Sequence, residues 1–327
     1  MKTNIINSFK FFYLQCFTYS KVIFKQHEER SFIAWMRNNN AFYTGDEYHL
    51  RLGIYLTNLR FVEEYNKNSN HLSKVSMNKF ACYTKSEYYS LLGVIPGLSK
   101  SQTRTTINLK PGNDDPESLD WRDKGAVNSV KDQGSCGSCY SFSAIAAEEG
   151  AYFVSSGTLY RLSEQNLIDC SKTCLGCLGG LPELVLGQAL NNQDHKFALE
   201  SDYPYVAEQR LCTFDQTKAV AYISAITMYR EEKYIQPNLI KWGPTSVCID
   251  ASGQGFMLYS GGIYEGSDCD QLQNHAVCVV GYGKENENSY WIVRNSWGSA
   301  WGKDGYIRML RNINVCNIQG TITGIEI

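Results

Sequence analysis

Between residues 27 and 70, hydrophobic side chains recur every three or four positions, which is the spacing of one face of an α-helix. No proline interrupts this pattern. It runs through seven apolar residues, which are Phe32, Trp35, Met36, Leu52, Tyr55, Leu59 and Val62. We therefore expect the N-terminal region to be helical.

A second helical pattern begins at Cys139 and continues to Val154, directly behind a Gly-Ser pair. The last third of the chain differs, because short runs of β-branched and aromatic residues alternate there with glycine and polar turns, as in strands. These runs cover residues 276–283, 290–294 and 306–310. Helices followed by strands predict an α+β fold with segregated helical and β layers.

The composition changes between Ile95 and Pro116, where proline, glycine, serine, threonine and aspartate become frequent. Such a stretch is typical of an exposed linker and of a site of proteolysis. We therefore divide the chain into a candidate targeting segment at residues 1–22, an N-terminal region at 23–112 and a C-terminal domain at 113–327.

Charge is distributed unevenly over these parts. Residues 1–110 carry 15 Lys and Arg against 7 Asp and Glu, a net +8, whereas residues 111–327 carry 16 against 26, a net −10. The two parts should therefore attract each other. The whole chain has a net charge of −2 and no basic stripe, which argues against a nucleic-acid-binding protein.

The twelve cysteines point to an oxidising compartment, since ten of them lie between Cys136 and Cys316. We expect a protein of the secretory pathway, in a lysosome-like compartment or outside the cell. The aromatic stretch from Phe9 to Tyr19 is the candidate targeting segment, although Lys10 interrupts it. No apolar run reaches the roughly 20 residues of a transmembrane helix, so we expect no membrane span.

The strongest chemical signal is the sequence Gln133-Gly-Ser-Cys136-Gly-Ser-Cys139-Tyr140. A cysteine nucleophile reacts as the thiolate, which a helix N-terminus and a neighbouring imidazolium both stabilise. Cys139 stands where the predicted helix begins. It is therefore the candidate nucleophile.

The base for this cysteine must come from two histidines, because residues 111–327 contain only His195 and His275. His275 lies 136 residues beyond Cys139 and precedes a strand-like run. A single histidine is more often a surface or core residue than a catalyst, and we interpret His195 in that way.

These motifs resemble the papain family of cysteine proteases, and the resemblance extends from about residue 28 to the end of the chain. It implies a papain-like fold of two lobes, one helical and one β-barrel-like, preceded by a helical propeptide. It also implies four catalytic residues: Cys139 as nucleophile, His275 as base, Asn295 as the partner of the imidazole, and Gln133 as an oxyanion-hole donor. Trp297 and Trp301 would shield the His–Asn hydrogen bond from water.

Three alternatives compete with this interpretation. Cys136/Cys139 and Cys174/Cys177 form two C-x-x-C pairs, as in a four-cysteine zinc site, but 34 residues separate the pairs instead of the usual range of about 15–20. A thioredoxin-like redox motif would need a surrounding βαβ pattern, which the sequence lacks. The third alternative is an inactive homologue that keeps the fold as a scaffold. We expect no metal and no cofactor.

The resemblance further implies three disulfides, which pair Cys136 with Cys177, Cys170 with Cys212, and Cys269 with Cys316. Each would stabilise the fold by about 2–4 kcal/mol. Cys248 and Cys278 stand in apolar runs, where a buried thiol packs as a small hydrophobe. Nothing in the sequence explains Cys174.

By the same resemblance, the glycines of this chain's Cys177-Leu-Gly-Gly-Leu-Pro182 pair with an extended substrate. The implied substrate-binding residues are Gly179, Gly180, Leu181, Pro182, Cys248, Gln273, Ala276 and Thr321. Thr321 is uncharged at the position where cathepsin B has an acid, so we expect Leu, Val or Phe two residues before the cut in preference to Arg. No His-His segment resembles the occluding loop of exopeptidases, which favours an endopeptidase.

Six residues of the N-terminal region resemble the helix motif of cathepsin L-like propeptides, namely Glu47, Arg51, Tyr55, Asn58, Val62 and Asn66. Their spacing puts them near one helical face. A second propeptide motif follows in Ser76-Met-Asn78-Lys-Phe80-Ala-Cys82, where Cys82 replaces an aspartate. We therefore expect residues 23–112 to be a propeptide that inhibits the enzyme. The other expected partners are protein or peptide substrates, and we expect the enzyme to be a monomer.

The lost aspartate puts the family's acid trigger in doubt, and charge offers a substitute. Protonation of carboxylates on the −10 domain would weaken its attraction for the +8 region. The purified precursor should therefore mature faster at pH 4.5 than at pH 7.5 when timed samples are compared on a gel. Equal rates at the two pH values would exclude this trigger.

Overall fold

The computed structural model describes residues 26–98, 109, 112 and 114–327. The candidate targeting segment at residues 1–22 lies outside the described residues. No described helix combines the length and the apolar character that crossing a membrane requires.

The contacts divide the chain into two compact units, Met1–Leu56 and Thr57–Ile327. This division by contacts falls inside helix α2, Gly45–Lys67. Residues 57–98 therefore pack in one unit with the C-terminal domain.

The described helices are α1 Gln26–Asn38, α2 Gly45–Lys67, α3 Lys85–Tyr89, α4 Cys139–Ser156, α5 Glu164–Cys170, α6 Pro182–Asn192, α7 Ile235–Trp242 and α8 Gln254–Met257. Three of them, α1, α2 and α4, match the helical patterns expected from the sequence, and the others were not predicted. The strands are β1 Ser73–Val75, β2 Leu119–Asp120, β3 Lys196–Phe197, β4 Val220–Tyr222, β5 Ala225–Tyr229, β6 Thr245–Ile249, β7 Tyr259–Tyr264, β8 His275–Glu285, β9 Asn288–Arg294, β10 Tyr306–Leu310 and β11 Ile322–Glu326. The three strand-like runs predicted at residues 276–283, 290–294 and 306–310 correspond to β8, β9 and β10.

The first unit contains α1 and the beginning of α2, with residues 39–44 between the helices. Phe32 of α1 is fully buried. Its ring centroid lies 5.2 Å from that of Tyr48 and 5.3 Å from that of Tyr55. These aromatic contacts supply the small core of the unit.

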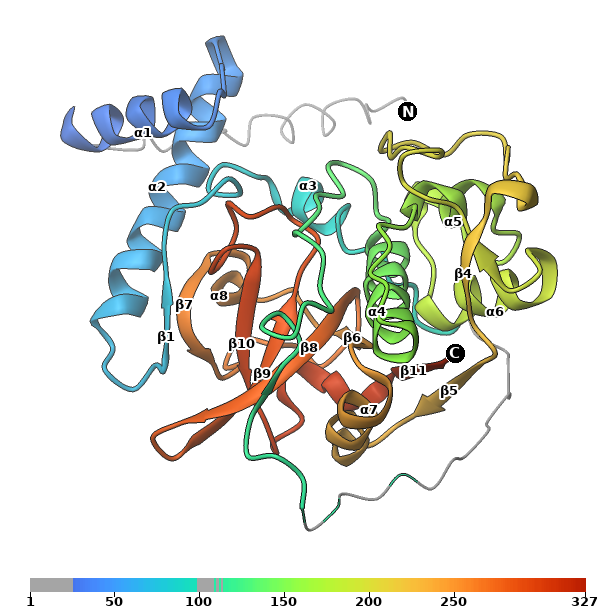
Figure 1. Cartoon of the computed structure of the whole chain (residues 1–327). Coiled ribbons are helices and arrows are strands. Elements are labelled where there is room, and N and C mark those ends of the chain that lie inside the picture. Colours follow the sequence, from blue (N-terminus) through green and yellow to red (C-terminus); the bar gives the residue numbers. More distant parts are fainter. Residues whose placement is uncertain (1–25, 99–108, 110–111, 113) are drawn as a thin grey trace, which may run out of the picture. The chain divides into compact units, whose positions relative to one another are not determined.

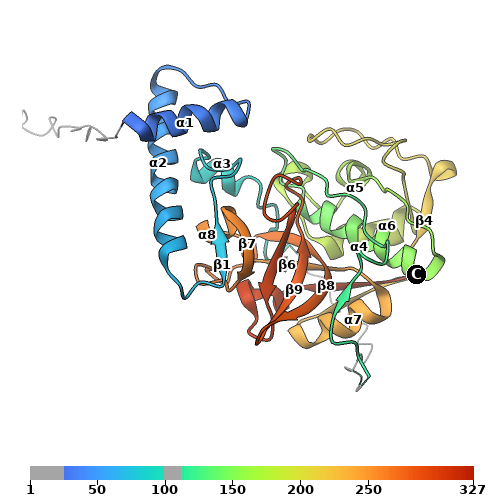
Figure 2. The same cartoon turned by 60° about the vertical axis from the view of Figure 1, so that its left-hand side comes forward.

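The second unit is built on a large sheet with the strand order β1-β7-β10-β9-β8-β6-β11-β5, and β2 pairs with β8. Figures 1 and 2 show α4, α5 and α6 on one side of this unit and most of the large sheet on the other. The segregated α+β architecture is therefore confirmed. β1 and β5 are the two ends of the sheet, so the described strands form no closed barrel where the resemblance implied a barrel-like lobe.

Helix α4 joins the two layers, and its first thirteen residues are all buried. Gly150 marks the closest approach to the sheet, because a Cβ atom there would lie 2.3 Å from Cγ of Pro244, which precedes β6. The absence of a side chain at this position lets the helix pack directly against the start of the strand.

Gly150→Ala should lower the free energy of unfolding by about 1–3 kcal/mol, because the added methyl group overpacks the contact with Pro244. Alanine otherwise favours a helix over glycine by about 1 kcal/mol, so the sign of the change is diagnostic. Urea unfolding of a Cys139→Ala precursor, which cannot cleave itself, measures the effect. Gly261→Ala has open space around its Cβ position and serves as the control. A stabilising effect of Gly150→Ala would contradict the close packing.

Candidate active site

Cys139 is the first residue of α4, and its side chain is completely buried. The neighbouring Cys136 forms a disulfide with Cys177 and cannot act as a nucleophile. The Cys139 thiol belongs to no disulfide. Its position at a helix N-terminus, where backbone N–H groups lack intrahelical partners, favours the thiolate.

His275 is the first residue of β8, and Asn295 directly follows β9. The Nε2 atom of His275 lies 2.8 Å from Oδ1 of Asn295. The same Oδ1 accepts the backbone N–H of Ser296 at 2.8 Å, so it is an acceptor and Nε2 carries the ring proton. Nδ1 of His275 is then the basic nitrogen, and it is buried without a hydrogen-bond partner among the described residues. His195, by contrast, is exposed and donates to the carbonyl of Ile223.

Aromatic rings enclose the imidazole. Trp297 stacks on His275 with a centroid separation of 4.7 Å, and Trp301 meets Trp297 edge-on at 5.1 Å. Phe80, from the second propeptide motif, also meets Trp297 edge-on at 5.0 Å. Trp297 therefore covers the imidazole and Trp301 packs behind Trp297, while Phe80 docks the N-terminal region on the same cluster.

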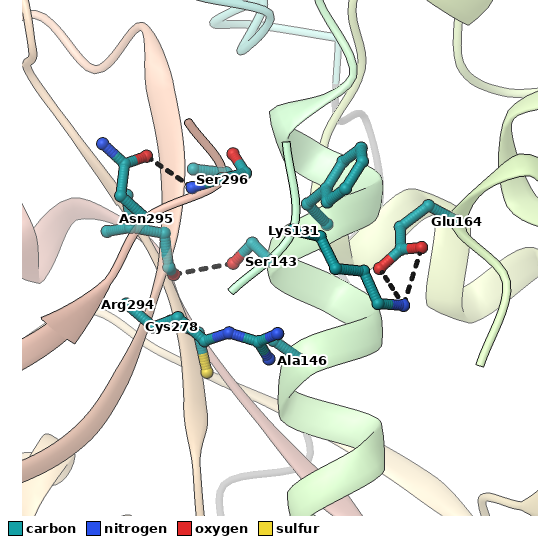
Figure 3. Close-up of a pocket in the computed structure, with 11 residues that line it drawn as sticks. Lys131, Ser143, Ala146, Glu164, Cys278, Arg294, Asn295 and Ser296 are labelled. Carbon is teal, nitrogen blue, oxygen red and sulfur yellow. Dashed lines mark hydrogen bonds and ion pairs between the residues drawn. The ribbon is translucent and has the colours of Figure 1, made fainter. Parts of the chain in front are cut away.

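A hydrogen bond from Ser143 sets the register between α4 and β8. Ser143 stands one helical turn after Cys139, and its hydroxyl donates to the carbonyl of Val277 across 2.6 Å. Figure 3 shows this side chain reaching from α4 to the neighbouring strand. Val277 lies two residues after His275, on the same face of β8. The backbone of Ala276, which lies between these two residues of β8, lowers the pKa of the Cys139 thiol against the larger effect of burial, which raises it.

Burial keeps both reactive groups neutral. It raises the pKa of the Cys139 thiol to about 11, although hydrogen bonds from the backbone of Ala276 and Gly93 oppose the shift. Burial also lowers the pKa of His275 to about 4, against the opposing hydrogen bond with Asn295. The site therefore holds a thiol and a neutral imidazole, not the thiolate–imidazolium pair of a reactive cysteine.

The Gln133 side chain is fixed at both ends of its amide. Its Oε1 accepts the hydroxyl of Ser296 at 2.7 Å, and its backbone N–H donates to the carbonyl of the same serine at 2.8 Å. Nε2 consequently points away from Ser296 and donates to the carbonyls of Cys136 and Leu91, both at 2.9 Å. The sequence analysis missed Ser296, although it directly follows Asn295.

Backbone carbonyls of the N-terminal region occupy the donors expected for a substrate. The Leu91 carbonyl takes the Nε2–H of Gln133, and the Gly93 carbonyl takes the backbone N–H of Gly180 at 2.8 Å. A Cβ atom on Gly93 would lie 1.8 Å from the carbonyl oxygen of Gly137. Only glycine can pass so close to the loop that precedes Cys139.

Val94 enters the apolar surroundings of the predicted substrate pocket. Its N–H donates to the carbonyl of Asn274 at 3.0 Å, and its side chain is 5% exposed. It belongs to the same buried apolar cluster as Leu181, Cys248 and Ala276. The structure therefore brings these three predicted pocket residues together with a valine of the N-terminal region.

The other predicted pocket residues also surround this cluster. Gln273 donates to the carbonyls of Cys248 and Asn317 at 2.7 and 2.9 Å and accepts the hydroxyl of Thr321 at 3.0 Å. Its amide is therefore already paired within the protein. Gly179 lies beside Ile95, whose side chain would be 3.0 Å from a Cβ atom on that glycine, and Pro182 opens α6.

The described residues form three disulfides, in the pairs that the resemblance implied: Cys136 with Cys177, Cys170 with Cys212, and Cys269 with Cys316. Because Cys136 is bonded to Cys177, the two C-x-x-C pairs cannot form a four-cysteine zinc site. Among the described residues, no three His, Cys, Asp or Glu side chains gather as metal ligands would. Cys174 packs behind Gly180, since a Cβ atom on that glycine would lie 2.6 Å from its sulfur.

A buried charge cluster next to the site escaped the sequence analysis. Nζ of Lys131 lies 2.8 Å from Glu164 and 3.4 Å from Glu149, and Figure 3 shows Lys131 against Glu164. Arg294 adds a second cation, 3.6 Å from Glu149. Burial raises the pKa of Glu164 to about 7, and Lys131 opposes that shift. Two members of the cluster stand within two residues of Gln133 or Asn295, so the cluster anchors both segments to α4 and α5.

The buried imidazole should make the precursor less stable in acid. Because folding lowers the pKa of His275 to about 4, the unfolded chain binds more protons between about pH 6.5 and 4, and stability falls as the pH decreases through that window. In a Cys139→Ala precursor, His275→Asn should flatten this part of the pH dependence in urea unfolding at pH 7, 5.5 and 4. The same slope in both proteins would contradict a neutral, buried imidazole.

Comparisons with known proteins agree with this geometry. Residues 115–325 match the family model described as papain family cysteine protease, and residues 32–88 match the cathepsin propeptide inhibitor domain (I29). The chain is 41% identical over 297 residues to the probable cysteine protease RD21B of Arabidopsis thaliana, covering 87% of this chain and 63% of that protein. It is 36% identical over 317 residues to cysteine proteinase 5 of Dictyostelium discoideum, covering 88% and 89%. The matches span less than two thirds of the three RD21 relatives' own length.

Solved precursor structures share the fold. Digestive procathepsin L 3 of Tenebrio molitor has a TM-score of 0.80 at 33% identity, over 93% of this chain and all of that chain. Procathepsin L2 of the same insect has a TM-score of 0.85 at 30% identity, over 92% and 100%. The chain therefore belongs to the papain family of cysteine proteases and carries a cathepsin-type propeptide inhibitor domain ahead of its protease domain.

Proposed function

We propose that this chain is the inactive precursor of a cysteine endopeptidase that cleaves protein and peptide substrates. One observation supports the proposal: the Ser143–Val277 hydrogen bond joins α4, which begins at Cys139, to β8, which begins at the His275 that pairs with Asn295. A backbone carbonyl of the same chain, that of Leu91, already fills the position next to the Gln133 donor.

Each predicted catalytic residue has a definite role in this reaction. Once the site is uncovered, the sulfur of Cys139 attacks the carbonyl carbon of the peptide, and its proton is held on Nδ1 of His275. The developing oxyanion is stabilised by Nε2–H of Gln133 and the backbone N–H of Cys139, and one such donor lowers the barrier by about 3 kcal/mol. Asn295 keeps the ring orientation, so that Nδ1 faces the sulfur throughout.

The second half of the reaction uses the same groups. The C–N bond breaks as the imidazolium of His275 gives its proton to the leaving amine, which leaves a thioester on Cys139. A water molecule then loses a proton to His275 and attacks the thioester. The product carboxylic acid departs, and the thiol is regenerated.

In this proposal, residues 23–112 are the inhibitory propeptide and residues 113–327 the peptidase domain, and a cut in the linker between them activates the enzyme. Residues 1–22 direct the chain to the secretory pathway, to a lysosome-like compartment or to the exterior. The enzyme acts as a monomer. The burial of Cys139 beneath Gly93 supports inhibition by the covering segment.

The residue two before the cut should be apolar. Val94 of the propeptide shares its buried apolar cluster with Leu181, Cys248 and Ala276. The charged group that acts on Cys248 is the buried Glu183 carboxyl, and burial raises its pKa and so favours its neutral form. The Gln273 amide is paired with backbone carbonyls and with Thr321, so it offers little to an incoming guanidinium. Leu, Val and Phe are therefore favoured over Arg.

An epoxide warhead should label the processed enzyme at Cys139, since only an activated thiolate opens the ring rapidly. Cys139→Ala should abolish both labelling and peptide hydrolysis, measured by mass spectrometry and with a fluorogenic substrate. Cys278→Ala, which removes another buried thiol, should leave labelling intact. Processed wild-type protein that neither reacts nor hydrolyses would identify an inactive scaffold.

A panel of fluorogenic dipeptides should give a kcat/KM about tenfold higher for Leu than for Arg at the residue two before the cut. Thr321→Glu should narrow this ratio, because it adds a charge beside Gln273. Arg substrates that exceed Leu substrates in the wild type would overturn the assignment of the pocket.

A further inference from the structure

A short loop, residues 133–138, connects the two donors of the proposed oxyanion hole. Gln133 opens the loop and supplies its side-chain amide, and Ser138 ends it by forming the peptide bond whose N–H belongs to Cys139. Two donors stabilise a developing oxyanion only if they are held in advance about 2.7–3.1 Å from the position of the same oxygen. The contacts that fix the two ends of this loop therefore set the spacing of the two donors.

The hydroxyl of Tyr205 is bonded to both ends of this loop. It donates to the backbone carbonyl of Gln133 across 2.7 Å, and it lies 2.8 Å from the hydroxyl of Ser138. A phenol has one hydrogen, which here is directed at the Gln133 carbonyl, so Ser138 is the donor in the second bond. The N–H of Cys136 also donates to the Gln133 carbonyl, but at a longer 3.4 Å. The phenol therefore supplies the shorter hydrogen bond at this carbonyl.

The Tyr205 side chain is itself held by helices α4 and α5. Its ring meets that of Phe142 edge-on with a centroid separation of 4.9 Å, and Phe142 stands three residues after Cys139 in α4. The next residue, Val206, donates its N–H to Oε1 of Gln165 in α5 at 3.0 Å. Burial raises the pKa of the Tyr205 phenol, so the hydroxyl keeps its proton and remains a donor through the neutral range.

Gln133 is thereby held at two separate points. Ser296 fixes the far end of its side-chain amide, whereas Tyr205 fixes the backbone from which that side chain leaves. We propose that Tyr205 is a positioning residue that joins Gln133 to Ser138 and so sets the spacing of the two oxyanion-hole donors. It acts through these donors and takes no part in proton transfer, so its loss should affect the transition state and not the reactivity of the Cys139 thiol.

The test compares Tyr205→Phe with the wild type as processed enzymes, on a fluorogenic dipeptide with Leu two residues before the cut and with active sites counted by the epoxide label. The substitution keeps the ring on Phe142 and removes only the hydroxyl. kcat should fall about tenfold with KM unchanged, because a misplaced donor weakens an interaction made only in the transition state. Alkylation of Cys139 by iodoacetamide forms no oxyanion, so its rate and pH profile should stay those of the wild type.

Two further variants serve as control and as substitute. The Tyr203 hydroxyl bonds to Asp169 of α5 and to residues 211 and 213, all outside the loop, so Tyr203→Phe should leave kcat and KM unchanged. Ser138→Ala removes the second bond of Tyr205 and should lower kcat about threefold. The Ser138 side chain makes no capping bond to α4, so this variant decides the result if Tyr205→Phe fails to fold.

A double-mutant cycle separates the positioning of Gln133 from a general loss of structure. In a Gln133→Ala background the side-chain donor is absent, so Tyr205→Phe should lower kcat by no more than about threefold.

The inference is overturned if Tyr205→Phe, or Ser138→Ala in its place, keeps the wild-type kcat or slows alkylation as much as hydrolysis. It is also overturned if Tyr203→Phe has the same effect, or if the full loss from Tyr205→Phe remains in the Gln133→Ala background. Processed wild-type enzyme that shows neither labelling nor hydrolysis would instead refute the proposed function, on which this inference rests.

Discussion

The hydrogen bond from Ser143 to the carbonyl of Val277 couples the helical layer to the sheet, and the relative positions of Cys139 and His275 depend on that coupling. Cys139 lies one turn away on the helix, and His275 lies two residues away on the strand. A slip of one residue along β8 would turn the imidazole to the opposite face of the sheet. Two turns further along α4, Gly150 packs directly against Pro244, the residue before β6, because it has no side chain.

The propeptide inhibits by backbone contacts and by exclusion of water. The carbonyl oxygens of Leu91 and Gly93 accept hydrogen bonds from donors that a substrate would need. This recognition uses the backbone and does not depend on the side chain at either position. Burial moves the pKa values of Cys139 and His275 in opposite directions, each toward the neutral form. In the covered site, burial therefore opposes formation of the thiolate–imidazolium pair.

Much of this architecture could be predicted from the sequence. Apolar residues at three- and four-residue spacing predicted α1, α2 and α4, and short β-branched or aromatic runs bounded by glycine and polar turns predicted β8 to β10. The division of the chain into units inside α2 could not be predicted, since composition marks the linker but not which residues pack together. The open sheet likewise depends on strand order, which pairs segments far apart in sequence.

In the candidate site, too, contacts between residues far apart in the sequence could not be predicted. Its four predicted residues carry local motifs, whereas Ser143, Ser296 and Lys131 position them without any motif of their own. No motif explains Cys174 in the sequence, whereas in the fold its sulfur packs behind Gly180. The contact of Tyr205 with Gln133 joins residues 72 apart, so no local pattern could have paired them.

The central claim is that residues 91–95 keep the Cys139 thiol neutral until they are removed. The most direct measurement is the rate of iodoacetamide alkylation of Cys139 against pH, in the intact wild-type precursor and in processed wild-type enzyme. The account predicts rapid alkylation of the processed enzyme below pH 7 and slow alkylation of the precursor that rises only at strongly alkaline pH. Equal rates and equal pH profiles before and after processing would contradict it.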